Sequence, residues 1–555
     1  MNAASRVLSV VAVGAGVAVA QPTTRVCLDS QGREGNAFSR GAALSDDGRL
    51  VVFSSQATNL VAGDTNHCED VFVHDRCTGT TARLSVDAAG VESNGASYDP
   101  VISADGRYVA FESAARNLVP GDNNNRYDVF VRDLVAGSIR RISVSTSGNE
   151  GNGDSAYASI SADGSAIAFS SSASNLVGGD GNAAADVFVC DLATGSLQRA
   201  SVSSAGGEAN GASSAAALSR DGRFVAFASA ASNLVSGDGN AAGDVFVHDL
   251  LSGTTLRASV NQAGDEANGG SYCPAISGDG RFVAFSSEAS NLIGGDKNHL
   301  ADVFVHDRDY DQNGVFDEPF GTMTVRASAA AGGDEADGAS EAPAISADGR
   351  YVTFESAASN LVVNDDNQCK DVFVRDLRTG LTSCASVSAL GAAGNAASLE
   401  AAVSGNGRVI AFTSYASNLV DGDGNAAKEV FVDDRITVLL HGTPQYQSPV
   451  DFLVSNATGE QGNIAIVMLS ASGTSGFTVP DGRTVPLTFD WCTQLGLELM
   501  PFLSAVIDAE GAAATPTFRF PEMPSGFTIY AAALTVKPNN AHIVSISGPT
   551  SFTTQ

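Results

Sequence analysis

The stretch SADGRYVAFES at residues 103–113, followed by DVFVRD at residues 128–133, decides the fold. Apolar residues alternate with polar or small ones in both segments, and this period of two is typical of β-strands. Asp105-Gly106 separates the second strand from a first one at residues 100–103, because glycine supplies the positive φ that tight hairpin turns require. A last strand is expected at residues 139–145. The stretch therefore predicts a unit of four short antiparallel strands.

The same unit recurs along the chain. The glycine of its first turn marks each copy: Gly48, Gly106, Gly164, Gly222, Gly280, Gly349 and Gly407. Five of the six intervals are 58 residues long and the other is 69, so one copy carries an 11-residue insertion. Seven units of four short strands are the sequence pattern of a propeller. We therefore expect an all-β protein built around a seven-bladed β-propeller.

The strand count also predicts how the ring closes. A strand at residues 24–28 precedes the first unit, with Arg25 at the position that Arg83 occupies in a later copy. The last unit has its third strand at residues 430–433 and no fourth strand after it. One leading strand, seven sets of three and six fourth strands make 28, or seven blades of four. The N-terminal strand is thus expected to complete blade seven and leave no free sheet edge.

Two further segments flank the propeller, which we place at residues 21–437. Arg6 precedes an apolar run at residues 7–20 that ends in Ala-Val-Ala, the pattern of a signal peptide at residues 1–20 with cleavage before Gln21. The run is too short to span a membrane, so we expect a secreted or periplasmic protein. At residues 438–555 the repeat is absent, and short alternating segments between Gly/Pro turns predict a small β-sandwich.

Composition limits the partners. Hydrophobic residues make up 43% and charged residues 17%, which excludes a disordered acidic polymer and a coiled coil. The 62 acidic and 31 basic residues give a net charge of −31, which disfavours nucleic acid and anionic membranes. We expect a monomer whose partner is a protein or glycan of the cell envelope or extracellular space. The eight cysteines are scattered and form no CxxC pair.

The repeat also suggests a family. The segments at residues 103–113 and 128–133 resemble TolB-like propeller repeats of exported bacterial proteins. The resemblance covers about residues 22–437 and implies a propeller that resides in the periplasm or outside the cell. TolB has a separate domain ahead of its propeller, whereas here the extra domain follows it, so the resemblance does not imply the role of TolB.

Carboxylates and amides gather in the loops between the second and third strands, where each copy reads D-x-N-x-x-x-D or a close variant. In the first five blades these possible rim ligands are Asp64, Asn66, Asp70, Asp122, Asn124, Asp128, Asp180, Asn182, Asp186, Asp238, Asn240, Asp244, Asp296, Asn298 and Asp302. Glutamates of the loops between blades join them on the same face: Glu92, Glu150, Glu208, Glu266 and Glu335. One interpretation is structural, since Asp and Asn side chains bond nearby backbone amides in turns. The other is calcium, a hard cation that prefers oxygen ligands.

The insertion in blade five gives a sharper calcium signal. Its aspartates and asparagine alternate before Gly314, as in an EF-hand-type loop, but Phe320 stands where a bidentate glutamate is expected. The predicted ligands of a single calcium ion are Asp309, Asp311, Asn313, Val315, Asp317 and Glu318. The competing interpretation is an acidic, solvated turn.

Signals for catalysis are weak, and no catalytic residue is predicted. His74, His248 and His306 share one repeat position, which we interpret as a variable, exposed strand site. No nucleophile elbow, H-E-x-x-H motif or phosphate loop is present. The first hypothesis is therefore a non-enzymatic binding or cell-surface assembly scaffold with structural calcium. The alternative is an extracellular hydrolase or lyase that acts on polysaccharide or protein from the acidic long-loop face.

Overall fold

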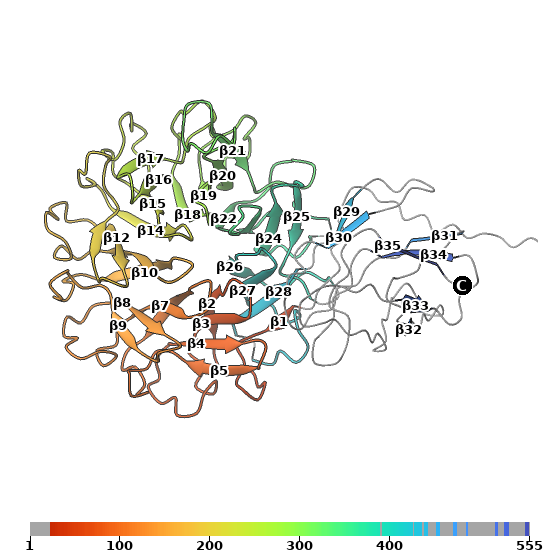
Figure 1. Cartoon of the computed structure of the whole chain (residues 1–555), viewed down its shortest axis with the longest axis horizontal. Coiled ribbons are helices and arrows are strands. Elements are labelled where there is room, and N and C mark those ends of the chain that lie inside the picture. The colour runs from red at the N-terminus through yellow and green to blue at the C-terminus, as the bar shows by residue number, and fades with distance from the viewer. Residues whose placement is uncertain are drawn as a thin grey trace, which may run out of the picture. The chain divides into compact units, whose positions relative to one another are not determined.

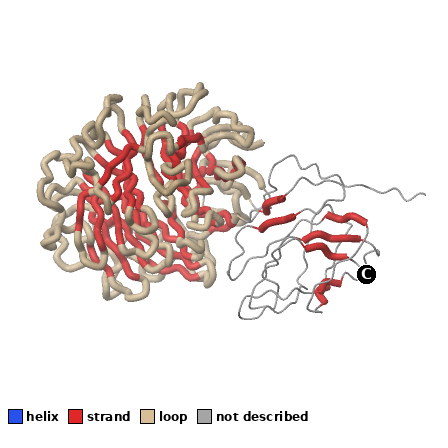
Figure 2. Tube along the Cα trace, turned by 45° about the horizontal axis from the view of Figure 1, so that its top comes forward, coloured by secondary structure: helices blue, strands red, loops and turns tan. Residues whose placement is uncertain are grey.

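The computed structural model describes residues 23–435, apart from residues 364, 389, 390 and 426, together with seven short strand segments beyond residue 435. Every regular element in these described residues is a β-strand (Figure 2). They include no helix long and apolar enough to cross a membrane.

The strands of residues 24–434 form seven four-stranded sheets arranged as the blades of a propeller (Figure 1). Blades one to three are β2 (Ser39–Leu44), β3 (Leu50–Ser55), β4 (Asp70–Asp75) and β5 (Thr80–Arg83); β6 (Ser97–Ile102), β7 (Tyr108–Ser113), β8 (Asp128–Asp133) and β9 (Ile139–Arg141); and β10 (Ser155–Ile160), β11 (Ala166–Ser171), β12 (Asp186–Asp191) and β13 (Leu197–Arg199). Blades four and five are β14 (Ser213–Leu218), β15 (Phe224–Ser229), β16 (Asp244–Asp249) and β17 (Thr254–Arg257); and β18 (Ser271–Ile276), β19 (Phe282–Ser287), β20 (Asp302–Asp307) and β21 (Met323–Arg326). Blade six is β22 (Ser340–Ile345), β23 (Tyr351–Ser356), β24 (Asp371–Asp376) and β25 (Leu381–Cys384), and blade seven is β26 (Ser398–Val403), β27 (Val409–Ser414), β28 (Glu429–Asp434) and β1 (Thr24–Arg25).

The predicted closure of the ring is confirmed. Strand β1 pairs antiparallel with β28, with Thr24 opposite Val432 and Arg25 opposite Phe431, so blade seven combines both ends of the repeat region (Figure 1). Just beyond β1, the Val26 N–H donates to the carbonyl oxygen of Val430 at 3.0 Å. The first strands of successive blades contact one another around the ring, from β2 and β6 to β26 and β2, and therefore surround its axis.

The hydrophobic core lies between neighbouring blades. Each second and third strand contributes a buried phenylalanine, and the two rings of a blade lie about 6 Å apart, as in the pair Phe111–Phe130 at 6.0 Å. Between blades seven and one, Val26 and Phe53 pack into one cluster with Val430. The alternating pattern of the repeat thus buries one face of each sheet against the next blade.

The first strand of each blade begins earlier than expected, because it contains a β-bulge. In blade two it starts at Ser97 instead of residue 100, and the register shifts between Tyr98 and Val101. The bulge residue Asp99 has a φ of 45°, in the left-handed region. The seven equivalent residues all have positive φ: Gly41, Asp99, Tyr157, Ala215, Cys273, Ala342 and Glu400. These bulges place one residue per blade on the axial side of the ring.

The shared histidine position is buried, so its interpretation as an exposed site was wrong. His74, His248 and His306 are 6%, 5% and 1% exposed. In blade five, Nδ1 of His306 lies 2.9 Å from Oγ1 of Thr324, which in turn donates to the carbonyl oxygen of Val260 in the preceding blade at 2.6 Å. The other two histidines contact Thr81 and Thr255 in the same way. These side chains therefore join neighbouring blades.

The buried histidines predict a loss of stability in acid. Burial lowers the pKa of His306 to about 4, although Asp317 lies 4.0 Å from its Nε2 atom, whereas an unfolded histidine titrates near 6.5. Protonation therefore favours the unfolded chain, and the free energy of unfolding should fall as the pH drops from about 6.5 to about 4. Urea unfolding of wild type and His306→Asn should show a shallower decline for the variant over this range. A decline of equal steepness in both proteins would contradict the assignment.

The chain beyond the propeller is described only in part. The compact propeller unit ends at Arg435. Further on, β29 (Val438–His441) pairs with β30 (Asp451–Val454), β34 (Phe527–Ala531) pairs with both β31 (Ser470–Gly473) and β35 (Thr550–Thr553), and β32 (Thr484–Pro486) runs parallel to β33 (Thr517–Arg519). The predicted signal peptide and most of the predicted sandwich at residues 438–555 lie outside the described residues.

Candidate functional site

The rim residues predicted from the repeat do come together, but around an arginine. In blade one, Nη1 of Arg83 lies 3.4 Å from Asp64, 3.3 Å from Asp70 and 3.0 Å from Glu92. Six of the seven blades have an equivalent arginine. Each binds one carboxylate of the rim loop, one at the start of the third strand, and one glutamate of the loop between blades. These arginines are Arg25, Arg83, Arg141, Arg199, Arg257 and Arg326, which we call the rim arginines. Their side chains are 7–9% exposed.

The asparagine of each rim loop has a structural role. In blade one, Nδ2 of Asn66 donates to Asp70 at 2.9 Å, while its Oδ1 atom accepts the N–H of Cys68 at 2.8 Å. Asp70 also accepts hydrogen bonds from Ser85 and Ser93. This geometry supports the interpretation of the motif as a turn-forming element. In these blades the chain itself supplies the cation that the carboxylates require.

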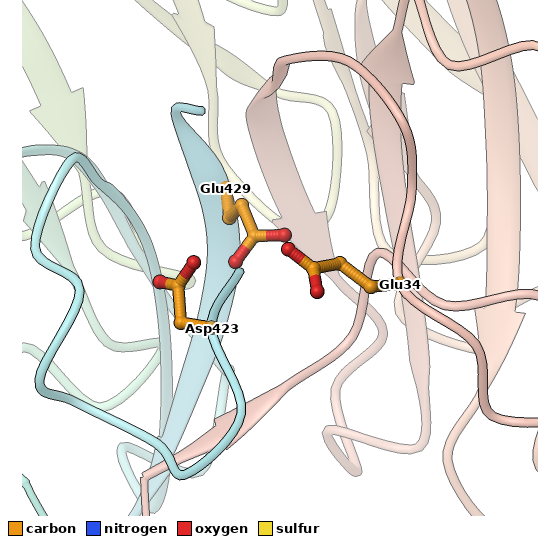
Figure 3. A group of neighbouring side chains, drawn as sticks. All are labelled: Glu34, Asp423 and Glu429. Atoms are coloured by element: carbon orange, nitrogen blue, oxygen red, sulfur yellow. The ribbon is translucent and has the colours of Figure 1, made fainter. Parts of the chain in front are cut away.

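Three rim clusters bring their carboxylate oxygens within 4.8 Å of one another, close enough to share a metal ion: Glu34, Asp423 and Glu429; Asp180, Asp186 and Glu208; and Asp296, Asp302 and Glu335. Figure 3 shows the first group, in which Glu34 faces Glu429 and Asp423 of blade seven. Burial raises the pKa of Glu429 to about 7 against the opposing charge of Arg25. A rim arginine forms ion pairs with each of these groups: Arg25, Arg199 and Arg326, respectively. A metal ion bound there would have to compete with the guanidinium group.

The insertion of blade five holds the predicted calcium ligands in one loop. Asp309 accepts the backbone N–H of Asn313 at 2.9 Å and that of Gly314 at 3.2 Å. Asn313 donates to both Asp311 and Glu318. Asp317 is turned away from this group and binds Arg308, whose guanidinium stacks on Phe224 and Phe316. In this structure Asp309, Asp311, Asn313 and Glu318 lie together, whereas Asp317 serves the packing of the insertion.

A second site, which was not predicted from the sequence, lies on the axial side of blades seven, one and two. We call it the axial cluster; it consists of Arg40, Glu69, Tyr98, Asp99, Glu112, Tyr127, Glu400, Tyr415 and Lys428. Nε of Arg40 donates to Glu69 at 2.7 Å, and its Nη2 atom donates to the other carboxylate oxygen at 3.0 Å. Nζ of Lys428 donates to Glu400 at 2.5 Å.

Tyrosines cover these ion pairs. The guanidinium of Arg40 lies 5.2 Å from the ring centre of Tyr98, which packs at 5.9 Å against Tyr127. On the other side, Nζ of Lys428 lies 5.9 Å from the ring centre of Tyr415. Tyr415 is 51% exposed and the Arg40 side chain 38%, so the axial cluster is open to solvent.

Two carboxyl groups of the axial cluster are coupled. Burial, together with the charge and hydrogen bond of Asp99, raises the pKa of Glu112 to about 7. Glu112 also accepts the N–H of the bulge residue Tyr157 at 3.1 Å. The pKa of Asp99 is raised as well, chiefly by burial, so both carboxyl groups of this pair hold their protons more tightly than exposed carboxyl groups do.

The residues of the axial cluster lie at or next to the ends of the strands nearest the axis. At these positions the residue type changes from one blade to the next. In blade four the equivalent positions carry Ser214, Ala215, Ala228 and Gly243, all small. The cluster was not predicted because residues at these positions vary between copies without any evident pattern. A comparison of the varying positions across the seven copies is the signal that could have found it.

No family model and no curated protein matches the chain. Solved structures with a similar propeller include TolB-like proteins. TolB from Acinetobacter baumannii is 15% identical with a TM-score of 0.34, and the match covers 61% of this chain and 63% of that one. The β-propeller domain of the Trilobed protease from Pyrococcus furiosus is 12% identical, with a TM-score of 0.44 over 72% of this chain and 95% of that one. An oligogalacturonate lyase from Vibrio parahaemolyticus is 11% identical, with a TM-score of 0.41 over 72% of this chain and 90% of that one. The likeness concerns the fold alone.

Proposed function

We propose that this chain is an exported, non-enzymatic binding protein whose axial cluster holds a protein or glycan of the cell envelope or extracellular space. One observation carries the proposal. Positions that build the fold are nearly alike in all seven blades, whereas the inner strand ends carry charged and aromatic side chains in blades seven, one and two and only small ones in blade four. Residues that differ between otherwise equal blades serve something other than the scaffold.

The chemistry of the axial cluster suits a polar ligand. Tyrosines such as Tyr98 and Tyr415 offer flat apolar faces with a polar tip, which suits sugar rings and peptide side chains. The Arg40–Glu69 and Lys428–Glu400 pairs place both charges at the same opening, so they can recognise donors and acceptors together.

A pair of variants at one repeat position tests this proposal. Tyr98 and Ser214 are equivalent residues of blades two and four. On glycan and peptide arrays, Tyr98→Ala should bind the best ligand of the wild type at least tenfold more weakly, since it removes an aromatic contact. Ser214→Ala should bind as the wild type does. Equal binding by wild type and both variants would place the ligand elsewhere and overturn the proposal.

The Asp99–Glu112 pair favours a second candidate, a hydrolase or lyase acting on polysaccharide or protein. General acid catalysis needs a carboxyl group that holds its proton near neutral pH, and the raised pKa of Glu112, about 7, gives this pair such a group. Turnover of a glycan or peptide substrate that Glu112→Gln abolishes, with the fold intact by circular dichroism, would replace the binding role with an enzymatic one.

Structural calcium belongs to the proposed function, and the blade-five insertion is its best site. Asp309, Asp311 and Glu318 repel one another unless a cation neutralises them, so calcium should raise the melting temperature of the full chain. Asp309→Asn/Asp311→Asn should lose one calcium site in titration calorimetry. Asp265→Asn, an exposed aspartate of blade four, is the control and should retain it. Unchanged stoichiometry in the double variant would move the site to the rim clusters, one of which is shown in Figure 3.

A further inference from the structure

Blade six departs from the arrangement of the six rim arginines. Cys384 stands opposite Phe373, in the register that places Arg83 opposite Phe72 in blade one, so Cys384 takes the place of the arginine. The bridge between Val387 and Ala393 likewise matches the one between Val86 and Glu92, so Ala393 takes the place of the glutamate. The two aspartates remain, as Asp365 and Asp371.

The carboxylate of Asp371 is held as in the other blades, but without a cation. Asp371 is 0% exposed, and its oxygens accept hydrogen bonds from Ser386 and Asn367, each at 2.5 Å. Among the described residues, neither Asp371 nor Asp365 forms an ion pair. A buried carboxylate in a protein is normally paired with a positive charge. The same carboxylates in the other six blades bind a guanidinium group, which is an independent indication of what this position accepts.

We propose that blade six binds a guanidinium group from outside the chain, between Asp365 and Asp371, where the other blades use their own arginine. The side chain of Cys384 ends at Sγ and carries no positive charge, so blade six lacks the guanidinium group that the other blades place beside these aspartates. In blades one, two and four a single guanidinium nitrogen, Nη1, lies 3.1–3.8 Å from both equivalent aspartates, so this pair of positions accepts a guanidinium group. Among the described residues, the groups of three or more side chains that could share a metal ion do not include Asp365 and Asp371. This inference is independent of ligand binding at the axial cluster.

Titration calorimetry of the full chain with methylguanidinium tests the proposal, with N-methylurea as a neutral ligand of similar shape. Wild type should bind one methylguanidinium and no N-methylurea. Cys384→Arg/Ala393→Glu restores the arrangement of the other blades and should bind at least tenfold more weakly. Asp365→Asn should weaken binding to a similar extent, and it keeps the test decisive if the double variant does not fold. Absence of binding to wild type, or equal binding to wild type and Asp365→Asn, would overturn the proposal.

The reverse change gives a matched gain of function. Arg141→Cys/Glu150→Ala reproduces blade six in blade two, and it should raise the stoichiometry from one methylguanidinium to two. An unchanged stoichiometry in this folded variant would contradict the proposal. Agmatine and the peptide Gly-Arg-Gly then distinguish the sources of the ligand: binding of agmatine alone indicates a small free guanidine compound, and binding of both indicates an arginine of a partner protein.

Discussion

Deleting residues 21–30 should open the ring and sharply lower the melting temperature. The deletion removes β1, so Val430 and Val432 lose their contacts with Val26, which is 2% exposed. Each buried aliphatic side chain of this size contributes about 1.5–3 kcal/mol. The deletion also removes Arg25, whose Nε atom lies 2.6 Å from the buried Glu429, so this carboxyl group loses the opposing charge that offsets its burial. Differential scanning calorimetry of the full and truncated chains measures the effect.

Deleting residues 445–555 is the control for this experiment, and it should leave the melting transition of the propeller in place. The compact propeller unit ends at Arg435, so this second truncation removes none of its strands. If both truncated chains melt at the temperature of the full chain, the pairing of β1 with β28 does not hold the ring together.

Replacing one rim arginine should be the most damaging single change on the long-loop face. Arg141 lies 3.1 Å from Asp122, 3.2 Å from Asp128 and 3.0 Å from Glu150, and its side chain is 7% exposed. Arg141→Met leaves these carboxylates without their cation and should lower the free energy of unfolding by about 3–5 kcal/mol. Urea unfolding at pH 7 measures the loss, which should shrink at lower pH as the carboxylates take up protons.

The matched variant for Arg141→Met is Arg141→Cys/Glu150→Ala, which copies the arrangement of blade six. It removes one carboxylate together with the arginine, and blade six shows that this combination is compatible with the fold. Its cost should therefore be clearly smaller than that of the single change. A double variant less stable than Arg141→Met would show that Glu150 stabilises the loop independently of the arginine.

The fold could be predicted because its signal is repeated seven times. The turn glycines, the strand pattern and the position of Arg25 were enough to predict the blades, their number and the closure by β1. The bulge at Asp99 was missed because the equivalent residues share no type, so alternation alone placed the start of the strand three residues late. The histidine position was misjudged for a related reason. Variation between His74, Arg132 and Cys190 suggested exposure, whereas each side chain fills the same contact between blades.

The site was harder to predict than the fold, because it depends on contacts between blades. The rim carboxylates were recognisable, but that Arg83 lies among Asp64, Asp70 and Glu92 follows only from three-dimensional packing. The axial cluster joins residues as distant in sequence as Arg40 and Lys428. The replacement of the arginine by Cys384 in blade six is visible in the sequence. Its consequence could not be predicted, because it depends on what the other six arginines bind.

The seven bulge residues form a surface whose side chains can be changed without changing the strands of the propeller. Residues in the left-handed region exclude β-branched side chains, and the seven bulge residues include no valine, isoleucine or threonine. The bulge N–H groups are bonded to a preceding blade where the structure shows their partners, as for Asp99 with Ser54 and Ala342 with Ser286. A library randomised over glycine, asparagine, aspartate and other unbranched residues at these seven positions would therefore vary the recognition surface while every blade kept its register.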